Sequence, residues 1–281
     1  MILIADSGST KTDWCLKEGE LVVRKTTQGI NPVHQDEKAI KWIIKEELIS
    51  QSPELVSGQI ENVYFYGAGC AGKSAELVSS VLKSAIRLRH LEVNSDLLAA
   101  ARALCGREEG IASILGTGSN SCFYNGNQIV MAVPPLGYIL GDEGSGAVLG
   151  KIFLNRLFKG DLSEDICSLY LKESGLTYQN IIDKVYRQPL ANRFLATIST
   201  FIGRHRKIYP ELRNLVVENF RSFFRVNVAK YHRADLSVGA IGSVAFHYQE
   251  ELREAARLEG FKVGEIQKSP MEGLLQYHSL T

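Results

Sequence analysis

Residues that could bind a phosphate follow the first apolar stretch of the chain. After Met1–Ala5 the sequence reads DSGSTKTD, with two acids, four hydroxyl residues, a glycine and a lysine. The backbone N–H groups and hydroxyls of such a turn can face an anion, and its first acid can face the metal ion bound to that anion. The same composition also suits a solvated hairpin turn, because Gly, Ser, Thr and Asp are favoured there for backbone reasons alone. This stretch alone leaves both interpretations open.

Three later stretches carry small or acidic residues at comparable places. Asp96 lies at a strand-to-helix junction, where an acid is also a favoured helix N-cap. LGTGSN at 115–120 follows a predicted strand, and GAIGS at 239–243 joins a predicted strand to a helix. Two hairpins, one in each half of the chain, could hold the phosphates of one nucleotide from opposite sides. The third turn could then lie beside adenine and ribose, with Asp96 facing the γ-phosphate.

The elements that would position these residues follow from hydrophobic periodicity. Strands are predicted over 2–5, 13–17, 21–26, 63–66, 90–94 and 236–240, and helices over 34–49, 73–87, from 94 onward and through most of 145–233. The segment GIASILGTGSNSCFYNGNQIVMAV repeats the opening order of strand, small-residue turn, strand, turn and strand. This repeat of pattern predicts two related α/β units with a boundary near residue 97. The closing segment SPMEGLLQYH is predicted to be a helix that could return to the first unit.

Bulk properties argue against several classes of protein. The 281 residues include 32 Lys and Arg against 31 Asp and Glu, so the net charge of +1 offers no field to gather nucleic acid or membrane lipid. No apolar run approaches the ~20 residues that span a bilayer, and the start lacks the features of a signal peptide. The five cysteines are widely spaced without a CxxC, which fits a reducing cytosol. We therefore expect a cytoplasmic protein that binds neither nucleic acid nor membrane.

Five motifs taken together resemble a known family. They are DSGSTKTDW, NSDLLAAARAL, ILGTGSNS, LGDEGSG and SVGAIGSVA. The set is similar to the BadF/BadG/BcrA/BcrD ATPases of the actin, hexokinase and Hsp70 superfamily, and above all to their N-acetylglucosamine kinase members. The resemblance runs from residue 1 to about 275. It implies an α/β fold of two actin-like ATPase (ribonuclease H-like) lobes, 1–97 and 98–281, with mixed five-stranded sheets, a helical insertion at about 145–233 and a central cleft.

The resemblance also implies an activity and the residues that carry it. The implied enzyme transfers the γ-phosphate of ATP to the 6-hydroxyl of an amino sugar, with N-acetylglucosamine as the first choice. Asp96 would be the general base and Asp6 the Mg²⁺ ligand. The residues expected to contact ATP are Asp6, Gly8, Ser9, Thr10, Lys11, Thr12, Gly116, Thr117, Gly118, Ser119, Gly239, Gly242 and Ser243. Those expected to contact the sugar are Asn31, Gly69, Asn120, Gly137 and Asp142.

Alternatives remain open at this point. Tyr138 stands where amino-sugar kinases often have tryptophan, so glucosamine is an alternative acceptor, and Asn31 could equally be a turn residue before Pro32. A non-catalytic ATP-binding sensor is the alternative from another class, because a fold does not determine a function. Asp96 favours an enzyme, since a pure binder needs no base. The iron–sulfur activators of the family and the ROK-type kinases need cysteine patterns that we do not recognise in this chain. A homodimer is left open.

Overall fold

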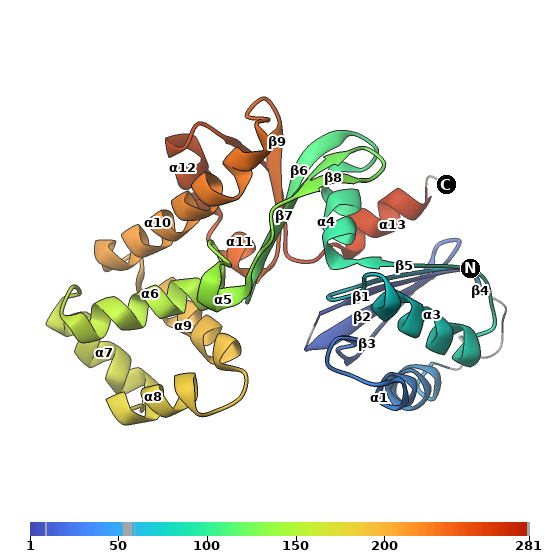
Figure 1. Cartoon of the computed structure of the whole chain (residues 1–281), viewed down its shortest axis with the longest axis horizontal. Helices are drawn as coiled ribbons and strands as arrows, with labels where there is room; N and C mark the ends of the chain where they lie inside the picture. Colours follow the sequence, from blue (N-terminus) through green and yellow to red (C-terminus); the bar gives the residue numbers. More distant parts are fainter. Residues whose placement is uncertain (9, 53–57, 59, 280–281) are drawn as a thin grey trace. The chain divides into compact units, whose positions relative to one another are not determined.

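The chain forms two compact α/β units (Figure 1). The structure is a computed structural model and describes residues 1–8, 10–52, 58 and 60–279. The first unit comprises Met1–Arg107 and Pro270–Thr281, and the second comprises Glu108–Ser269. The expected boundary at residue 97 falls inside helix α4 (Asp96–Cys105), which packs on the strands of the first unit. The closing helix α13 (Met271–Ser279) also belongs to the first unit and lies beside α4.

The first unit is built on a mixed five-stranded sheet in the order β3-β2-β1-β4-β5. Its strands are β1 (Ile2–Ser7), β2 (Lys11–Glu18), β3 (Leu21–Gln28), β4 (Ile60–Gly67) and β5 (Leu88–Ser95). Its other helices are α1 (Glu37–Trp42), the π-helix η1 (Ile43–Ile49) and α3 (Lys73–Ala85). The helix predicted from residue 34 begins three residues later, because the Asp36 side chain accepts a hydrogen bond from Ala39 N–H at 2.9 Å and caps it.

The second unit has a sheet of the same design, in the order β10-β9-β6-β7-β8. Its strands are β6 (Glu109–Leu115), β7 (Ser119–Asn125), β8 (Ile129–Ala132), β9 (Ser237–Ile241) and β10 (Lys262–Gln267). Its helices are α5 (Gly137–Leu140), α6 (Gly146–Lys159), α7 (Glu164–Ser174), α8 (Tyr178–Tyr186), α9 (Ala191–His205), α10 (Pro210–Val226), the 3₁₀ helix η2 (Val228–Tyr231), α11 (Ser243–His247) and α12 (Gln249–Leu258). β10 was not predicted from the sequence, because its two apolar residues, Val263 and Ile266, give only a weak strand signal with Gly264 and Glu265 between them.

The two sheets share one topology. In each, the first strand pairs antiparallel with the second and parallel with the fourth, and the fifth strand adds in parallel to the fourth. The repeat seen in the sequence is therefore a repeat of a whole sheet, and the predicted fold of two mixed five-stranded α/β lobes is confirmed. Within the described residues, no helix combines the length and the apolar character needed to cross a membrane.

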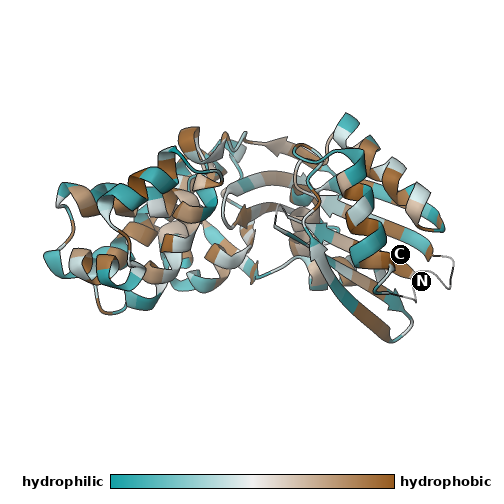
Figure 2. Ribbon diagram, turned by 90° about the horizontal axis from the view of Figure 1, so that it is seen from below, coloured by the Kyte–Doolittle hydropathy of each residue, from teal (hydrophilic) through white to brown (hydrophobic). Residues whose placement is uncertain are grey.

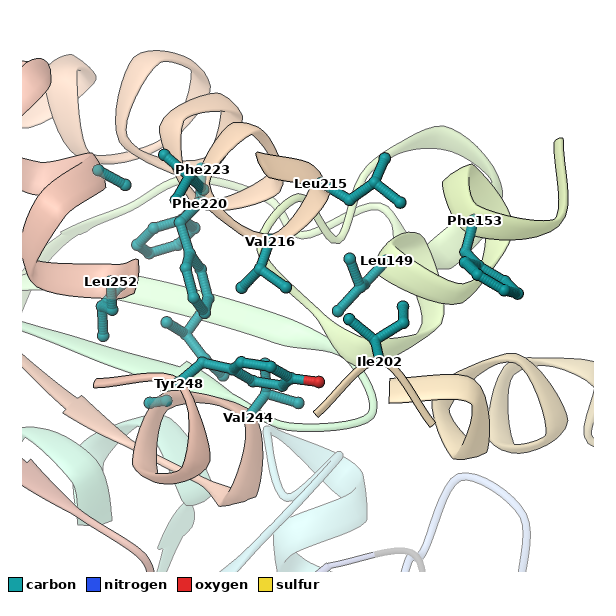
Figure 3. Close-up of a cluster of buried hydrophobic side chains, with 14 of the residues drawn as sticks. Leu149, Phe153, Ile202, Leu215, Val216, Phe220, Phe223, Val244, Tyr248 and Leu252 are labelled. Atoms are coloured by element: carbon teal, nitrogen blue, oxygen red, sulfur yellow. The ribbon is translucent and has the colours of Figure 1, made fainter. Parts of the chain in front are cut away.

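Each unit buries its own apolar core. In the first unit the apolar residues of the helix predicted over 34–49 pack against the sheet and are buried, namely Ile40, Ile43, Ile44 and Leu48. In the second unit the core joins the sheet to the helical segment, and Figure 3 shows a part of it. The helices of this segment alternate between hydrophobic and hydrophilic stretches, as amphipathic helices do (Figure 2). Three buried phenylalanines of α10 lie in this core, namely Phe220, Phe223 and Phe224.

Helices α6 and α9 pack so closely that one position allows no side chain. A Cβ at Gly150 of α6 would lie 2.0 Å from the carbonyl oxygen of Leu195 in α9. We expect Gly150→Ala to force the helices apart and to lower the free energy of unfolding by about 1–3 kcal/mol. Denaturant titration followed by circular dichroism measures this loss. Asn155→Ala, at an exposed position of the same helix, is the control and should stay within about 0.5 kcal/mol of the parent. Parental stability of Gly150→Ala would contradict the close packing.

Candidate active site

The carboxyl ends of three parallel strands bring two acids to one edge of the first sheet. Ser7 of β1 lies opposite Gly67 of β4, which lies opposite Ser95 of β5. Asp6 precedes Ser7, and Asp96 follows Ser95 as the first residue of α4. Since neighbouring strands lie about 4.8 Å apart, the two carboxylates share this edge with only β4 between their strands.

Ser95, rather than Asp96, caps helix α4. The Ser95 hydroxyl accepts a hydrogen bond from Leu98 N–H at 3.3 Å. The capping role that the sequence allowed for Asp96 is therefore taken by its neighbour. Asp96 Oδ1 accepts a hydrogen bond from Leu97 N–H at 2.9 Å, which leaves Oδ2 for another partner. The fold thus needs no acid at position 96 to start the helix.

The two acids are held where a negative charge is unfavourable. The pKa of Asp6 is raised to about 7, first by burial and then by the nearby charges of Asp96 and Asp13, while Lys11 opposes the shift. Burial also raises the pKa of Asp96, against the opposing hydrogen bond from Leu97 N–H. Perturbed carboxylates of this kind are typical of functional sites, because an ordinary surface acid is solvated instead.

The residues around Asp6 suit a hard divalent cation bound through water. Mg²⁺ prefers oxygen ligands and usually keeps several of its waters, so one or two carboxylates are enough. Asp6 supplies such a carboxylate, and the neighbouring charges of Asp13 and Asp96 are a negative potential that a cation would offset. Among the described residues there is no group of three or more His, Cys, Asp or Glu side chains placed to enclose a metal directly. The donor set therefore fits Mg²⁺ held mainly by water and substrate oxygens.

The first hairpin turn points its flanking hydroxyls inward. The hydroxyls of Ser7 and Thr12 are 2.7 Å apart, and Ser7 Oγ also donates to Ile30 O at 2.9 Å. Thr12 Oγ1 donates to Gln28 O at 3.2 Å, and the residue is fully buried. Thr12 was expected to contact the phosphates, but its side chain belongs to the interior of the hairpin. We therefore leave it out of the proposed site.

The tip of this turn stays open to solvent. Gly8, Thr10 and Lys11 are exposed, whereas Ser9 lies outside the described residues. A Cβ at Gly8 would meet only Lys11 O, at the ordinary distance of 3.8 Å, so the fold itself does not require glycine there. Lys11 Nζ lies 2.5 Å from Asp13 Oδ2 with its side chain 63% exposed. Such an exposed ion pair is weak, so the lysine can leave it for an anion at low cost.

Two loop residues expected to bind the sugar lie against each other in the first unit. Gly69 has φ of +75°, and a Cβ there would lie 2.9 Å from Asn31 Oδ1. Asn31 N–H donates to Gln35 Oε1 at 2.8 Å, which orders the loop. Burial raises the pKa of Cys70, next to Gly69, to about 12, and the nearby charge of Asp96 adds to this shift. The Asn31 loop, the Gly69 turn and Asp96 therefore gather in one region.

The second glycine turn lies between β6 and β7 and is bound to the start of α6. Gly146 N–H donates to Gly116 O at 2.8 Å, and Ala147 N–H donates to Thr117 O at 3.1 Å. The turn closes on itself through Gly116 N–H and Gly118 O, 3.0 Å apart. A Cβ at Gly116 would meet no described atom within 4 Å, and its φ is not positive. Packing does not explain this glycine, whereas the close approach of a ligand to the backbone would.

Asp142 faces the second turn. Its Oδ1 accepts a hydrogen bond from Ser119 N–H at 3.3 Å, and a Cβ at Gly118 would lie 3.1 Å from its Oδ2. Asp142 has φ of +55°, a backbone conformation that residues other than glycine adopt uncommonly. Burial raises its pKa, and the adjacent charge of Glu143 adds to the shift. The loop therefore holds this acid in a particular place despite a backbone and electrostatic cost.

Asn219 of α10, which the sequence analysis did not single out, holds the loop that carries Asp142. It is buried, its Oδ1 accepts from Gly144 N–H at 3.1 Å, and its Nδ2 donates to Ser145 O at 3.1 Å. The available signal was a lone amide within an apolar helix stripe between Val216 and Phe220. A buried amide of this kind needs partners, and here the partners are backbone groups of the loop that carries Asp142.

The remaining two sugar candidates lie in the second unit. Asn120 is part of β7, and its Oδ1 accepts from Ser121 N–H at 2.9 Å. Gly137 has φ of +72° and begins α5, in the loop that leads to Asp142. Neither position is explained by a core contact, so both stay candidates.

The glycines of the third turn have mainly a structural role. Gly239 is buried inside β9, and its carbonyl accepts a hydrogen bond from Ser113 Oγ at 2.8 Å. Gly242 has φ of +123°, and a Cβ there would lie 2.4 Å from Leu115 O. These glycines let the turn after β9 pass over the end of β6, beside the Gly116 turn. Of the three residues expected to contact ATP here, Ser243 lines a pocket of the second unit, whereas Gly239 and Gly242 are not among the residues that line it.

That pocket has a volume of about 480 Å³ and is lined by residues of α9 and α11 and the turns that follow them. Ser199, Thr200 and Ser243 contribute hydroxyls, and Arg204 and His247 contribute basic side chains. Its volume lies in the range of small-ligand sites, about 300–1,000 Å³. The hydroxyl and basic side chains share this lining with the apolar surface of Val244 and Tyr248.

Comparison with known proteins agrees with this architecture. No family model matches the sequence, and no curated protein matches it either. A solved structure of a proposed N-acetylglucosamine kinase from Porphyromonas gingivalis matches with a TM-score of 0.96 and 49% identity, over 100% of this chain and 99% of that chain. A proposed N-acetylglucosamine kinase from Chromobacterium violaceum matches with a TM-score of 0.76 and 18% identity, over 98% of each chain. The ethanolamine utilization protein EutJ from Carboxydothermus hydrogenoformans gives 0.56 and 18%, over 96% of this chain and 86% of that chain.

The two sheets of one topology, with an acid and a glycine turn at their edges, define an actin-like ATPase fold, which the two distant matches share. The full-length match at 49% identity is far closer than a shared fold requires. The chain belongs to the N-acetylglucosamine kinase-like group of the BadF/BadG/BcrA/BcrD ATPase family.

The raised pKa of Asp6 predicts how stability should change with pH. Its carboxyl holds a proton more tightly in the folded chain than in the unfolded chain, so ionisation opposes folding increasingly as the pH rises to about 7. Asp6→Asn removes this charge, and we expect it to raise the melting temperature more at about pH 8 than at about pH 5. Thermal unfolding at both pH values measures the difference.

Glu20→Gln, in the exposed turn between β2 and β3, is the control and should show little dependence on pH. If Asp6→Asn brings no extra stability at the higher pH, Asp6 is not held in the unfavourable environment described here.

Proposed function

We propose that this protein is an ATP-dependent sugar kinase that phosphorylates the 6-hydroxyl of an amino sugar, N-acetylglucosamine before glucosamine. The observation that carries the proposal is the gathering of Asp96, Asp6 and the Asn31–Gly69 loops at one edge of the first sheet. The full-length relative supports the choice of sugar, since it is itself a proposed N-acetylglucosamine kinase.

Asp96 has the properties that a general base needs. It lies at the start of a helix whose cap is Ser95, so its Oδ2 is available to a substrate hydroxyl. A raised pKa makes the carboxylate a stronger base, and a catalytic pKa works best near the operating pH. Asp142, tied to Ser119 N–H, and Asn31 would hold other hydroxyls of the sugar and so orient the reacting one.

The proposed step is an in-line phosphoryl transfer. The sugar O6 forms a bond to the γ-phosphorus while the bond from that phosphorus to the β,γ-bridging oxygen breaks and ADP leaves. The O6 proton passes to Asp96 Oδ2. Lys11 would leave Asp13 for the phosphates, and the open backbone at Gly8, Gly116 and Gly118 would approach them closely. A Mg²⁺ ion held through water by Asp6 would supply charge neutralisation at the β- and γ-phosphates.

The pocket of the second unit would take the adenosine. Ser243 lines it, and Gly242 just before packs on Leu115 at the start of the Gly116 turn. A nucleotide with its base in this pocket would therefore bring its phosphates toward that turn. Gly239 is not part of this proposal, because it lies inside β9.

The direct test is ADP release from ATP and Mg²⁺ with a panel of N-acetylglucosamine, glucosamine, N-acetylmannosamine and glucose, with the product identified by phosphorus NMR. We expect N-acetylglucosamine to stimulate ADP release most strongly and to give a 6-phosphate ester. Stimulation by another sugar alone would support the assignment as a kinase but would change the assigned substrate. ATP binding without stimulation by any sugar would indicate a sensor.

The role of Asp96 gives a sharper prediction. We expect Asp96→Asn to fold and bind both substrates normally, because Ser95 caps the helix and Asn Oδ1 can still accept from Leu97 N–H. It cannot take the proton, so kcat should fall by about 10²–10⁴-fold. A coupled kinase assay and calorimetric binding on one preparation measure both effects.

The matched control is Asp165→Asn, which removes an acid from the first turn of α7. It should leave kcat at the parental level. Near-parental turnover of Asp96→Asn would remove this residue from the mechanism, and an unfolded variant would show that its role is structural.

A further inference from the structure

The pocket of the second unit is bounded by two walls that different segments provide. One wall comes from the last two turns of α9 and the residue that follows, and includes Ser199, Gly203 and Arg206 itself. The other comes from α11 and the following turn and includes His247 and Tyr248. The segments are more than thirty residues apart in the sequence, so the width of the pocket depends on contacts that tie them together.

Arg206, at the end of α9, makes most of the contacts that join the two walls. Its Nη1 donates to Gly203 O at 2.5 Å on its own wall, and its Nη2 donates to His247 O at 3.0 Å on the opposite wall. Its Nε donates to Glu251 Oε1 at 2.9 Å in α12. The guanidinium also lies 4.9 Å from the centre of the Tyr248 ring. All three guanidinium nitrogens are therefore engaged, each with a different residue.

The acid that receives Arg206 is buried. Glu251 is 2% exposed, and its Oε2 has no hydrogen-bond partner among the described residues. A buried carboxylate is stable only beside a compensating charge, and Arg206 lies nearest, with Arg213 Nε at 4.0 Å. The position of α12, and of the wall that precedes it, therefore depends on Arg206.

Tyr248 adds a second tie between the walls. Its hydroxyl donates a short hydrogen bond to Ser199 O, and its ring belongs to the same buried cluster as Ile202 of α9 and Val244 of α11 (Figure 3). A Cβ at Gly203 would lie 3.2 Å from the Tyr248 hydroxyl oxygen. Hydrogen bonds and apolar packing thus both join the walls in the absence of a ligand.

We infer that Arg206 is a positioning residue for nucleotide binding, which sets the spacing of the pocket walls and so the affinity for the nucleoside part of ATP. The inference rests on the proposed function for the identity of the ligand. A preformed pocket binds more tightly because less ordering remains to be done on binding. Lysine cannot replace Arg206, since an ammonium group lacks the planar fork that reaches three acceptors in different directions.

The test separates the two halves of the nucleotide. Calorimetry on the full chain measures binding of AMP, which needs the pocket, and of inorganic tripolyphosphate with Mg²⁺, which needs only the phosphate turns. We expect Arg206→Lys to weaken AMP binding roughly tenfold, the loss of one or two hydrogen bonds at the walls, and to leave tripolyphosphate binding unchanged. In the kinase assay KM for ATP should rise while KM for the sugar stays constant.

Two further variants guard against a general loss of folding. The double variant Arg206→Met with Glu251→Leu removes the buried charge together with its partner, so it should fold, and it should show the same selective loss of AMP binding. Arg225→Met removes a more exposed Arg–Glu pair, with Glu259, that lies away from the pocket lining, and Glu259 keeps Arg221 as a partner. This control should bind AMP like the parent.

Each outcome decides a different claim. Parental AMP affinity in a folded Arg206 variant overturns the inference and leaves the proposed function intact. Equal weakening of AMP and tripolyphosphate also overturns it, because that result indicates a general structural role. A parent that binds tripolyphosphate but not AMP overturns the assignment of the pocket to the nucleoside, and the inference with it. A parent that binds neither overturns the proposed function first.

Discussion

The arrangement of the first unit depends on the placement of two acids, Asp6 and Asp96, at one edge of its sheet. Burial makes both charges unfavourable there, and the nearby charge of Asp96 adds to this effect on Asp6, so the fold must hold the two acids in place by other means. The parallel register of β1, β4 and β5 sets the edge, and Ser95 caps α4 so that the carboxylate of Asp96 is not used up by the helix. The same edge receives the Gly69 turn, whose Ala68 N–H donates to Ser7 O at 2.9 Å. A cation bound at this edge would favour the ionised carboxylates and so stabilise the arrangement.

The closing helix anchors the helix that carries Asp96. Arg102 of α4 donates to the Tyr66 hydroxyl at 2.7 Å and to Glu92 at 3.1 Å, and Tyr66 lies opposite Asp6 in the sheet register. The Tyr66 hydroxyl is also hydrogen-bonded to His278 Nε2 at 2.8 Å. Burial lowers the pKa of His278 to about 4, so this residue joins the cluster as a neutral ring. Residues near the end of the sequence therefore support the edge that carries Asp6 and Asp96.

The sequence predicted most of the fold because its signals are local. Strand–turn–strand patterns and the periodic apolar residues of a helix, such as those from Ile40 to Leu48, can be recognised within short segments of the sequence. The repeat of the strand–turn–strand pattern predicted two sheets of one design. What it missed depends on long-range contacts: β10 is a strand because β9 lies beside it, and Asn219 matters because a loop about seventy-five residues earlier needs its amide. Residue type also could not distinguish a buried hydroxyl, as in Thr12, from an exposed one, as in Thr10. Nor could it distinguish a glycine required by close packing, such as Gly242, from a glycine with open space around it, such as Gly116. The site residues remain predictions, whereas the family and the two lobes are confirmed.

The central claim is that Asp6 and Asp96 form an acidic edge, offset only in part by Lys11, which a magnesium nucleotide completes. Carbon-13 NMR of the Asp6 carboxyl, titrated with pH in the presence and absence of Mg²⁺ and ADP, tests this claim most directly. The account predicts that the pKa of Asp6 is about 7 without ligand and falls markedly when Mg²⁺ and ADP are bound, because a cation favours the ionised form. An Asp6 carboxyl that titrates at the ordinary value for aspartate under both conditions would contradict it.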